Sequence, residues 1–200
     1  MSASALSAVV AFVEGRLTSA EFEQSLQRDP TIEQLLVDDP DLPPSTYVGS
    51  SVFLYLLQLN LSDPGDVVSA QGAAADWLKR HGIAHSMSSV ARDTHAVLLD
   101  AQPRWLRVDA KWIQDELLPH SEGRQGKALR EWLHAQLVER FRYATSPPSW
   151  IQSPVWPIGA GGPMVFLGQL TIDHYFHDSA AAYVFFDPAT RECRTILQVA

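Results

Sequence analysis

The spacing of apolar residues changes once along this chain, and the change indicates the fold class. Up to about residue 143, apolar side chains recur every three or four positions, as they do on one face of an α-helix. Residues 164–200 instead have the pattern of short strands, and a turn at residues 187–190 joins the last two as an antiparallel hairpin. We therefore predict an α+β protein in which about six helices pack with a small C-terminal antiparallel β-sheet.

A segment rich in proline and glycine separates the two patterns. Residues 144–163 contain five Pro and three Gly, with Trp150 and Trp156 among them. This composition predicts irregular chain that is anchored by its aromatic side chains. Two hundred residues are enough for one core. We expect a single domain, with a mainly helical part at 1–143, the connector at 144–163 and strands at 164–200.

Local signals place some of the helix boundaries. Thr18 and Glu21 have the spacing of a capping box, in which each side chain satisfies a backbone amide of the other residue. Residues 52–61 are apolar at nearly every position, which predicts a central helix buried on several sides. A long helix over residues 67–81, capped by Asp66, is expected to follow.

Negative charge is concentrated in the first part of the chain. The net charge is −8; residues 1–78 hold eleven acids and two bases, whereas residues 79–200 hold twelve acids and thirteen bases. The first part would repel phosphates, so nucleic acid is not an expected partner. It would attract a protein with a basic surface. The alternative is that the charge serves only to keep the protein soluble.

Targeting signals and disulfides are not expected. No apolar run reaches the roughly 18 residues that cross a bilayer, so no membrane partner is predicted. The N-terminal stretch carries no Lys or Arg before Arg16, which is unlike a secretory signal. Cys193 is the only cysteine, and an intrachain disulfide needs two. Together these features predict a cytoplasmic protein.

No catalytic residue, metal or cofactor is predicted. Asp173, His174, His177 and Asp178 form the most metal-like cluster, but a structural zinc site usually needs four nitrogen or sulfur ligands, and we favour a polar loop between strands. The glycine-rich residues 159–162 precede a strand, whereas a phosphate-binding loop precedes a helix. A small hydrolase that reverses a toxin's modification with the Asp/His cluster remains the alternative.

An acidic loop stiffened by prolines is the expected partner-binding surface. Residues 38–41 contain three acids, and three prolines at positions 40, 43 and 44 stiffen the loop, so it would lose little entropy when a basic partner docks. A tyrosine just beyond could supply an aromatic anchor. The predicted partner contacts are Glu33, Asp38, Asp39, Asp41, Tyr47, Asp63 and Asp66. The alternative is a solvated loop without a partner.

Two stretches resemble bacterial protein families. The tail, PVWPIGAGGPMVFLGQL followed by YVFFDPATRECRTILQV, is similar to the end of the DUF1963 (YwqG-like) family and matches it at Trp156, Pro157 and Gln169. The first part, from FVEGRLTSAEF through DWLKRHGI, resembles immunity proteins encoded beside bacterial polymorphic toxins, including those delivered by type VI secretion.

This resemblance implies an immunity protein that binds and neutralises a cognate toxin in the cytoplasm of the producing cell. The family offers no catalytic residue to carry over to this chain. A nuclease is the favoured class of toxin, because a basic substrate cleft would complement an acidic inhibitor. An adaptor protein is the remaining alternative.

Overall fold

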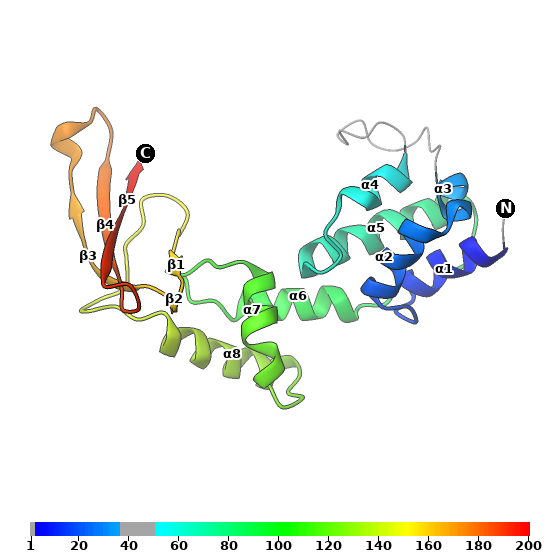
Figure 1. The fold of residues 1–200 in the computed structure, drawn as a ribbon, viewed down its shortest axis with the longest axis horizontal. Helices are drawn as coiled ribbons and strands as arrows, with labels where there is room; N and C mark the ends of the chain where they lie inside the picture. The colour runs from blue at the N-terminus through cyan, green and yellow to red at the C-terminus, as the bar shows by residue number, and fades with distance from the viewer. Residues whose placement is uncertain (1–2, 37–50) are drawn as a thin grey trace. The chain divides into compact units, whose positions relative to one another are not determined.

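A computed structural model describes residues 3–36 and 51–200 of the chain (Figure 1). The chain divides into two compact units, Met1–Ala96 (unit 1) and Val97–Ala200 (unit 2). The described residues form eight α-helices, a three-stranded antiparallel sheet and a small two-stranded one, which confirms the predicted α+β arrangement with two more helices than the six expected. That the chain folds as a single domain stays a prediction.

Unit 1 is built from helices whose apolar faces meet in one core. These helices are α1 (Ala3–Val13), α2 (Ser19–Arg28), α3 (Pro30–Leu36), α4 (Val52–Gln58) and α5 (Pro64–Arg80). Phe12 of α1 stacks on Phe22 of α2, with ring centroids 4.0 Å apart, and Trp77 of α5 is buried in the same cluster. The buried Gln71 side chain donates a 3.0 Å hydrogen bond to the Phe12 carbonyl, which fixes α5 against α1.

The capping box at the start of α2 is confirmed. The Thr18 hydroxyl accepts a hydrogen bond from the Glu21 backbone N–H at 3.2 Å, and the Glu21 carboxylate accepts from the Thr18 N–H at 2.9 Å. Two backbone N–H groups at the start of α2, those of Thr18 and Glu21, are therefore satisfied by the capping residues themselves.

Two other helix boundaries differ from prediction. Asp66 does not cap α5; the cap is Asp63, and Pro64 occupies the first helical turn, where a missing N–H costs nothing. The helix predicted over residues 52–61 ends at Gln58. The Asn60 N–H is instead bound by the Asp66 carboxylate at 2.8 Å, which holds this stretch in a turn.

Unit 2 combines helices with the sheet. Its elements are the end of α6 (Val90–Asp100), α7 (Ala110–Glu116), η1 (Leu118–His120), α8 (Gly126–Arg140), β1 (Ile158–Gly159), β2 (Gly162–Pro163), β3 (Val165–Thr171), η2 (Asp173–Tyr175), β4 (Ala180–Asp187) and β5 (Glu192–Val199). The strand order is β3-β4-β5, all antiparallel, and the register of β3 against β4 shifts between Phe166 and Gly168. The predicted hairpin of the last two strands is confirmed.

Trp156 fixes the proline-rich connector to the core of unit 2. Its side chain is 5% exposed, and its indole N–H donates to the Met164 carbonyl at 2.8 Å. Its ring lies between 5.2 and 5.6 Å from those of Trp105, Phe141 and Phe185, so it contacts both the helical and the strand part of the unit. Trp156 is buried as predicted, whereas Trp150 is only half-buried.

Three side chains of the sheet hold the backbone of residues 149–153. The Gln169 carboxamide on β3 accepts from the Ser149 N–H at 2.7 Å. The Tyr183 hydroxyl on β4 accepts from the Ile151 N–H at 3.0 Å, and the Gln198 carboxamide on β5 accepts from the Gln152 N–H at 3.0 Å. Side chains therefore replace the backbone partners that this irregular segment lacks.

Candidate functional site

The structure places only part of the predicted partner-binding surface. Glu33 lies exposed on α3, while Asp63 and Asp66 are half-buried at the start of α5. The other predicted contacts, Asp38, Asp39, Asp41 and Tyr47, lie outside the described residues.

The carboxylates of Asp63 and Asp66 stabilise the turn before α5. Asp63 accepts hydrogen bonds from the backbone N–H groups of Gly65 at 2.8 Å and Asp66 at 3.2 Å. Asp66 accepts from the Asn60 N–H at 2.8 Å. Because these lone pairs already serve the fold, a partner would have to share them.

Three further acids of unit 1 are also bound locally, and their ionised forms are stabilised. A hydrogen bond from Arg16 lowers the pKa of Glu14, and one from the Thr18 hydroxyl lowers the pKa of Glu21. The pKa of Asp29 is lowered by hydrogen bonds from the Thr31 hydroxyl and backbone. All three therefore remain charged well below neutral pH, and each fixes a helix end or a loop.

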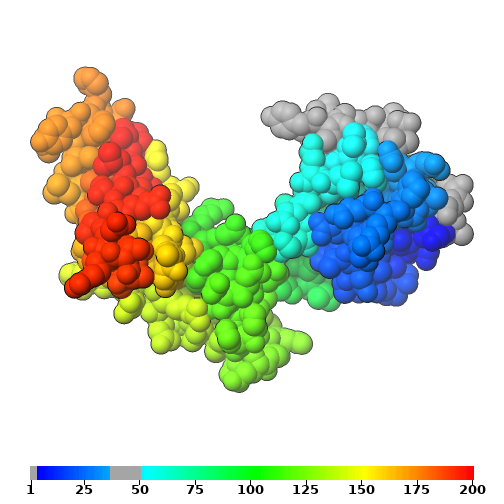
Figure 2. Space-filling model, viewed as in Figure 1, coloured from blue at the N-terminus to red at the C-terminus, as the bar shows by residue number. Residues whose placement is uncertain are grey.

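Glu23, Glu33 and Asp76 are different, because they have no ion-pair or hydrogen-bond partner within the described part of the chain. We call these three residues the unpaired acids; they lie on α2, α3 and α5. Residues of α2 and α3 form part of the surface of unit 1 in Figure 2, in blue. The sequence prediction included only Glu33, because a polar helix face does not show which of its acids lack a partner.

The charge of the two units is unequal. Unit 1 carries twelve acids and five bases, a net −7, whereas unit 2 carries eleven acids and ten bases, a net −1. Unit 1 therefore has most of the molecule's excess negative charge, and the unpaired acids are the described part of it that is open to a partner.

The Asp/His cluster between β3 and β4 does not form a metal-binding centre. The Asp173 carboxylate accepts a 2.6 Å hydrogen bond from the Ala180 N–H, and the His174 ring packs on Tyr175 with centroids 4.0 Å apart. Among residues 3–36 and 51–200, no three His, Cys, Asp or Glu side chains are grouped to hold a metal ion. Nor does any helix in these ranges have the length and apolarity to cross a membrane.

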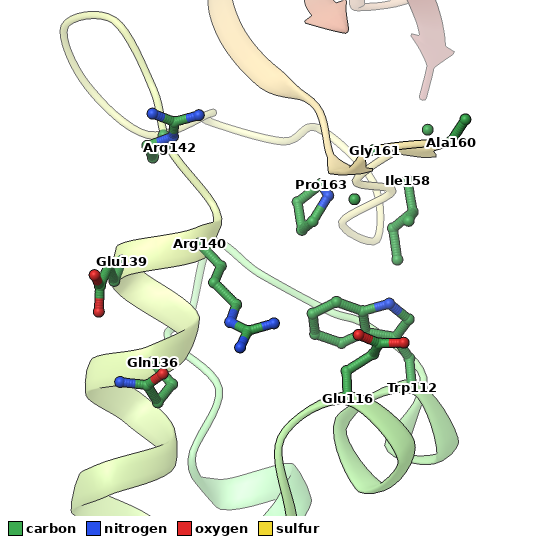
Figure 3. A pocket seen from close by; sticks show the side chains of 12 residues that line it. Trp112, Glu116, Gln136, Glu139, Arg140, Arg142, Ile158, Ala160, Gly161 and Pro163 are labelled. Carbon is green, nitrogen blue, oxygen red and sulfur yellow. The ribbon is translucent and has the colours of Figure 1, made fainter. Parts of the chain in front are cut away.

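Unit 2 contains a pocket that the sequence prediction missed. It has a volume of about 820 Å³ and lies where α7, the end of α8 and the β1–β2 hairpin meet (Figure 3). Arg140 and Arg142 line it together with Trp112 and the glycine-rich residues 159–162. These segments are far apart in the sequence, so no spacing pattern marks the site; only the glycine run was noticed.

A scan against protein-family models, a search of curated proteins and a search of solved structures each found no match to this chain.

Proposed function

We propose that this chain is an immunity protein, which binds a cognate antibacterial toxin and neutralises it in the cytoplasm of the producing cell. The observation that carries the proposal is the net charge of −7 on unit 1, together with its unpaired acids. Carboxylates without an internal partner do little for the fold. A basic partner protein would supply the counter-charges.

Charge complementarity fits the task of an immunity protein. A toxin must be intercepted quickly, and opposite charges raise the association rate by steering the encounter. A nuclease is the favoured toxin because the cleft that holds its phosphate substrate is basic. The resemblance of residues 12–83 to immunity proteins found beside polymorphic toxins, including type VI effectors, agrees with this assignment.

The proposal is tested with the protein encoded by the adjacent gene. We expect that protein to be toxic in a susceptible bacterial host, to bind this chain in a pull-down and to be neutralised by co-expression. If it does not bind and co-expression leaves the cells unprotected, the immunity function is excluded for this pair.

Charge reversal tests the surface itself. Glu33→Lys combined with Asp76→Lys should slow association with the toxin by about tenfold or more at low salt, because steering acts mainly on the association rate. The matched control is Asp178→Lys with Glu192→Lys, which makes the same charge change on exposed residues of unit 2. Equal association rates for the two double variants would show that the unpaired acids are not the contact surface.

A further inference from the structure

The pocket of unit 2 is large enough for a small molecule. Its volume of about 820 Å³ falls within the range of roughly 300–1,000 Å³ that is typical of ligand sites. Its lining comes from three separate elements of unit 2, so it is a product of the tertiary fold and not of one loop.

Three side chains at this pocket have N–H groups without a hydrogen-bond acceptor. Within the described ranges, the guanidinium groups of Arg140 and Arg142 and the indole N–H of Trp112 make no hydrogen bond, and neither arginine forms an ion pair. Arg140 is half-buried, and in Figure 3 its guanidinium points into the space in front of Trp112. A carboxylate or phosphate there would accept charge-assisted hydrogen bonds, the stronger kind.

The acids at the pocket restrict where that negative group can sit. In Figure 3 Glu139 points away from the space between Arg140 and Trp112, whereas Glu116 lies beside Trp112 and faces Arg140. A second anionic group near Glu116 would be repelled. In Figure 3 the guanidinium of Arg142 lies on the loop beyond the end of α8, apart from that of Arg140 and away from Trp112. The ligand should therefore carry its charge at one end, near Arg140.

One side of the pocket offers apolar surface on which a flat ring could pack. The Trp112 ring, Ile158 and Pro163 supply apolar surface opposite α8. Trp112 is held by an edge-to-face contact with the buried Phe141, with centroids 5.3 Å apart and planes at 76°. The ring is thus positioned before any ligand arrives, as in most small-molecule sites.

The glycine-rich wall is also fixed in place. A Cβ on Gly159 would collide with the Asp187 carboxylate, and one on Gly161 would lie 2.8 Å from the Ala189 Cβ. The β1–β2 hairpin therefore packs directly on the β4–β5 turn, and that contact leaves no room for side chains. This packing holds the pocket wall against the sheet.

We propose that this pocket binds a small organic anion, with one carboxylate or phosphate group held by Arg140 and a flat apolar body packed on Trp112. The site lies in unit 2 and uses none of the unpaired acids of unit 1. The anion-binding proposal can therefore be confirmed or refuted independently of the immunity function.

The test uses phenylacetate and phenyl phosphate as probes, with benzyl alcohol as the uncharged ring. The full chain is titrated while the indole N–H signal of Trp112 is followed by NMR; the signal is assigned by its loss in Trp112→Phe. Each probe is added to about 10 mM, above the millimolar affinity expected of so small a ligand. We expect a saturable shift with at least one anion and none with benzyl alcohol.

Substitution of arginine residues tests which guanidinium group binds the anion. Arg140→Gln should weaken binding of the anion about tenfold or more, because the charge-assisted hydrogen bonds of its guanidinium are lost. Arg130→Gln, an exposed arginine of α8 outside the pocket, should bind like the unmodified chain. Unchanged melting temperatures confirm that the variants are folded. The proposal is overturned if neither anion shifts the Trp112 signal, or if Arg140→Gln binds the anion as tightly as the unmodified chain.

Discussion

Gly159 is packed so closely in unit 2 that the addition of one methyl group should lower the stability of the protein. A methyl group at this position would collide with the buried Asp187 carboxylate, which already accepts from the Ala189 N–H at 2.8 Å. We expect Gly159→Ala to lower the free energy of unfolding by about 1–3 kcal/mol, the usual cost of overpacking.

Chemical denaturation measures this effect. The matched control is Gly168→Ala, where no described atom lies within 4 Å of the added Cβ. The control should change stability little, and equal effects at both glycines would contradict the predicted contact.

Trp156 is the residue whose truncation should cost most in unit 2. It is 5% exposed and joins the connector to the helical and strand parts through its ring contacts and its hydrogen bond to Met164. Trp156→Ala should lower the free energy of unfolding by about 3–5 kcal/mol. If the melting temperature of Trp156→Ala equals that of the unmodified chain, the aromatic cluster does not stabilise the unit.

At the scale of elements, the capping box of α2 predicts a dependence on pH. Hydrogen bonds from Thr18 lower the pKa of Glu21, so its contribution to stability is complete above the unfolded pKa and is lost as the pH falls through the folded pKa. Glu21→Gln should therefore destabilise the chain at neutral pH, and the difference should vanish in acid. Denaturation at neutral pH and at about pH 3 measures it.

The matched variant Thr18→Ala removes the other half of the capping box and should cost about 1 kcal/mol at neutral pH. A Glu21→Gln effect that stays constant with pH would mean that the ionised carboxylate is not what stabilises the helix end.

Two glycines, one inside helix α5 and one just after it, should respond to alanine substitution with opposite changes in stability. Gly72 lies inside the helix and Gly82 just beyond it, with φ +67°. Gly72→Ala should raise the free energy of unfolding by about 0.5–1 kcal/mol, because alanine loses less entropy in a helix. Gly82→Ala should lower it by about 1–2 kcal/mol, because a left-handed conformation disfavours a Cβ. Thermal melts of both variants test the sign.

Elements with a strong local signal were predictable from the sequence, and those decided by tertiary contacts were not. The Thr18 capping box is local and was found. Asp63 and Asp66 lie three residues apart at the start of α5, and the prediction chose Asp66 as the cap instead of Asp63, because backbone positions decide which amide each carboxylate reaches. Helix α6 was not predicted as a whole, since Leu98 is its one buried residue and its apolar pattern is correspondingly weak.

The same distinction applies to the candidate sites. Charge is visible in a sequence, so the acidic first part was recognised. Which acids are unpaired depends on the fold, so Glu23 and Asp76 were missed. The pocket around Arg140 and Trp112 was missed for a related reason, because its walls come from segments that the fold alone brings together.

At the scale of the whole molecule, the uneven charge predicts how salt affects binding. With −7 on unit 1 and −1 on unit 2, association with a basic toxin should slow as ionic strength rises. The rate should level off near about 1 M salt, where charges are screened beyond roughly 3 Å. Stopped-flow measurement of the association rate tests this, and a rate independent of salt would exclude electrostatic steering.

The hydrogen bonds from the sheet to residues 149–153 also bear on how unit 2 assembles. Their acceptors, Gln169, Tyr183 and Gln198, lie on three different strands, so the segment cannot be held until all three strands are in register. It should therefore be among the last parts of the unit to become ordered during folding. In native hydrogen exchange, the amides of Ile151 and Gln152 should be protected, although they belong to no helix or strand, but less than those of the sheet, because the segment can open while the sheet stays folded.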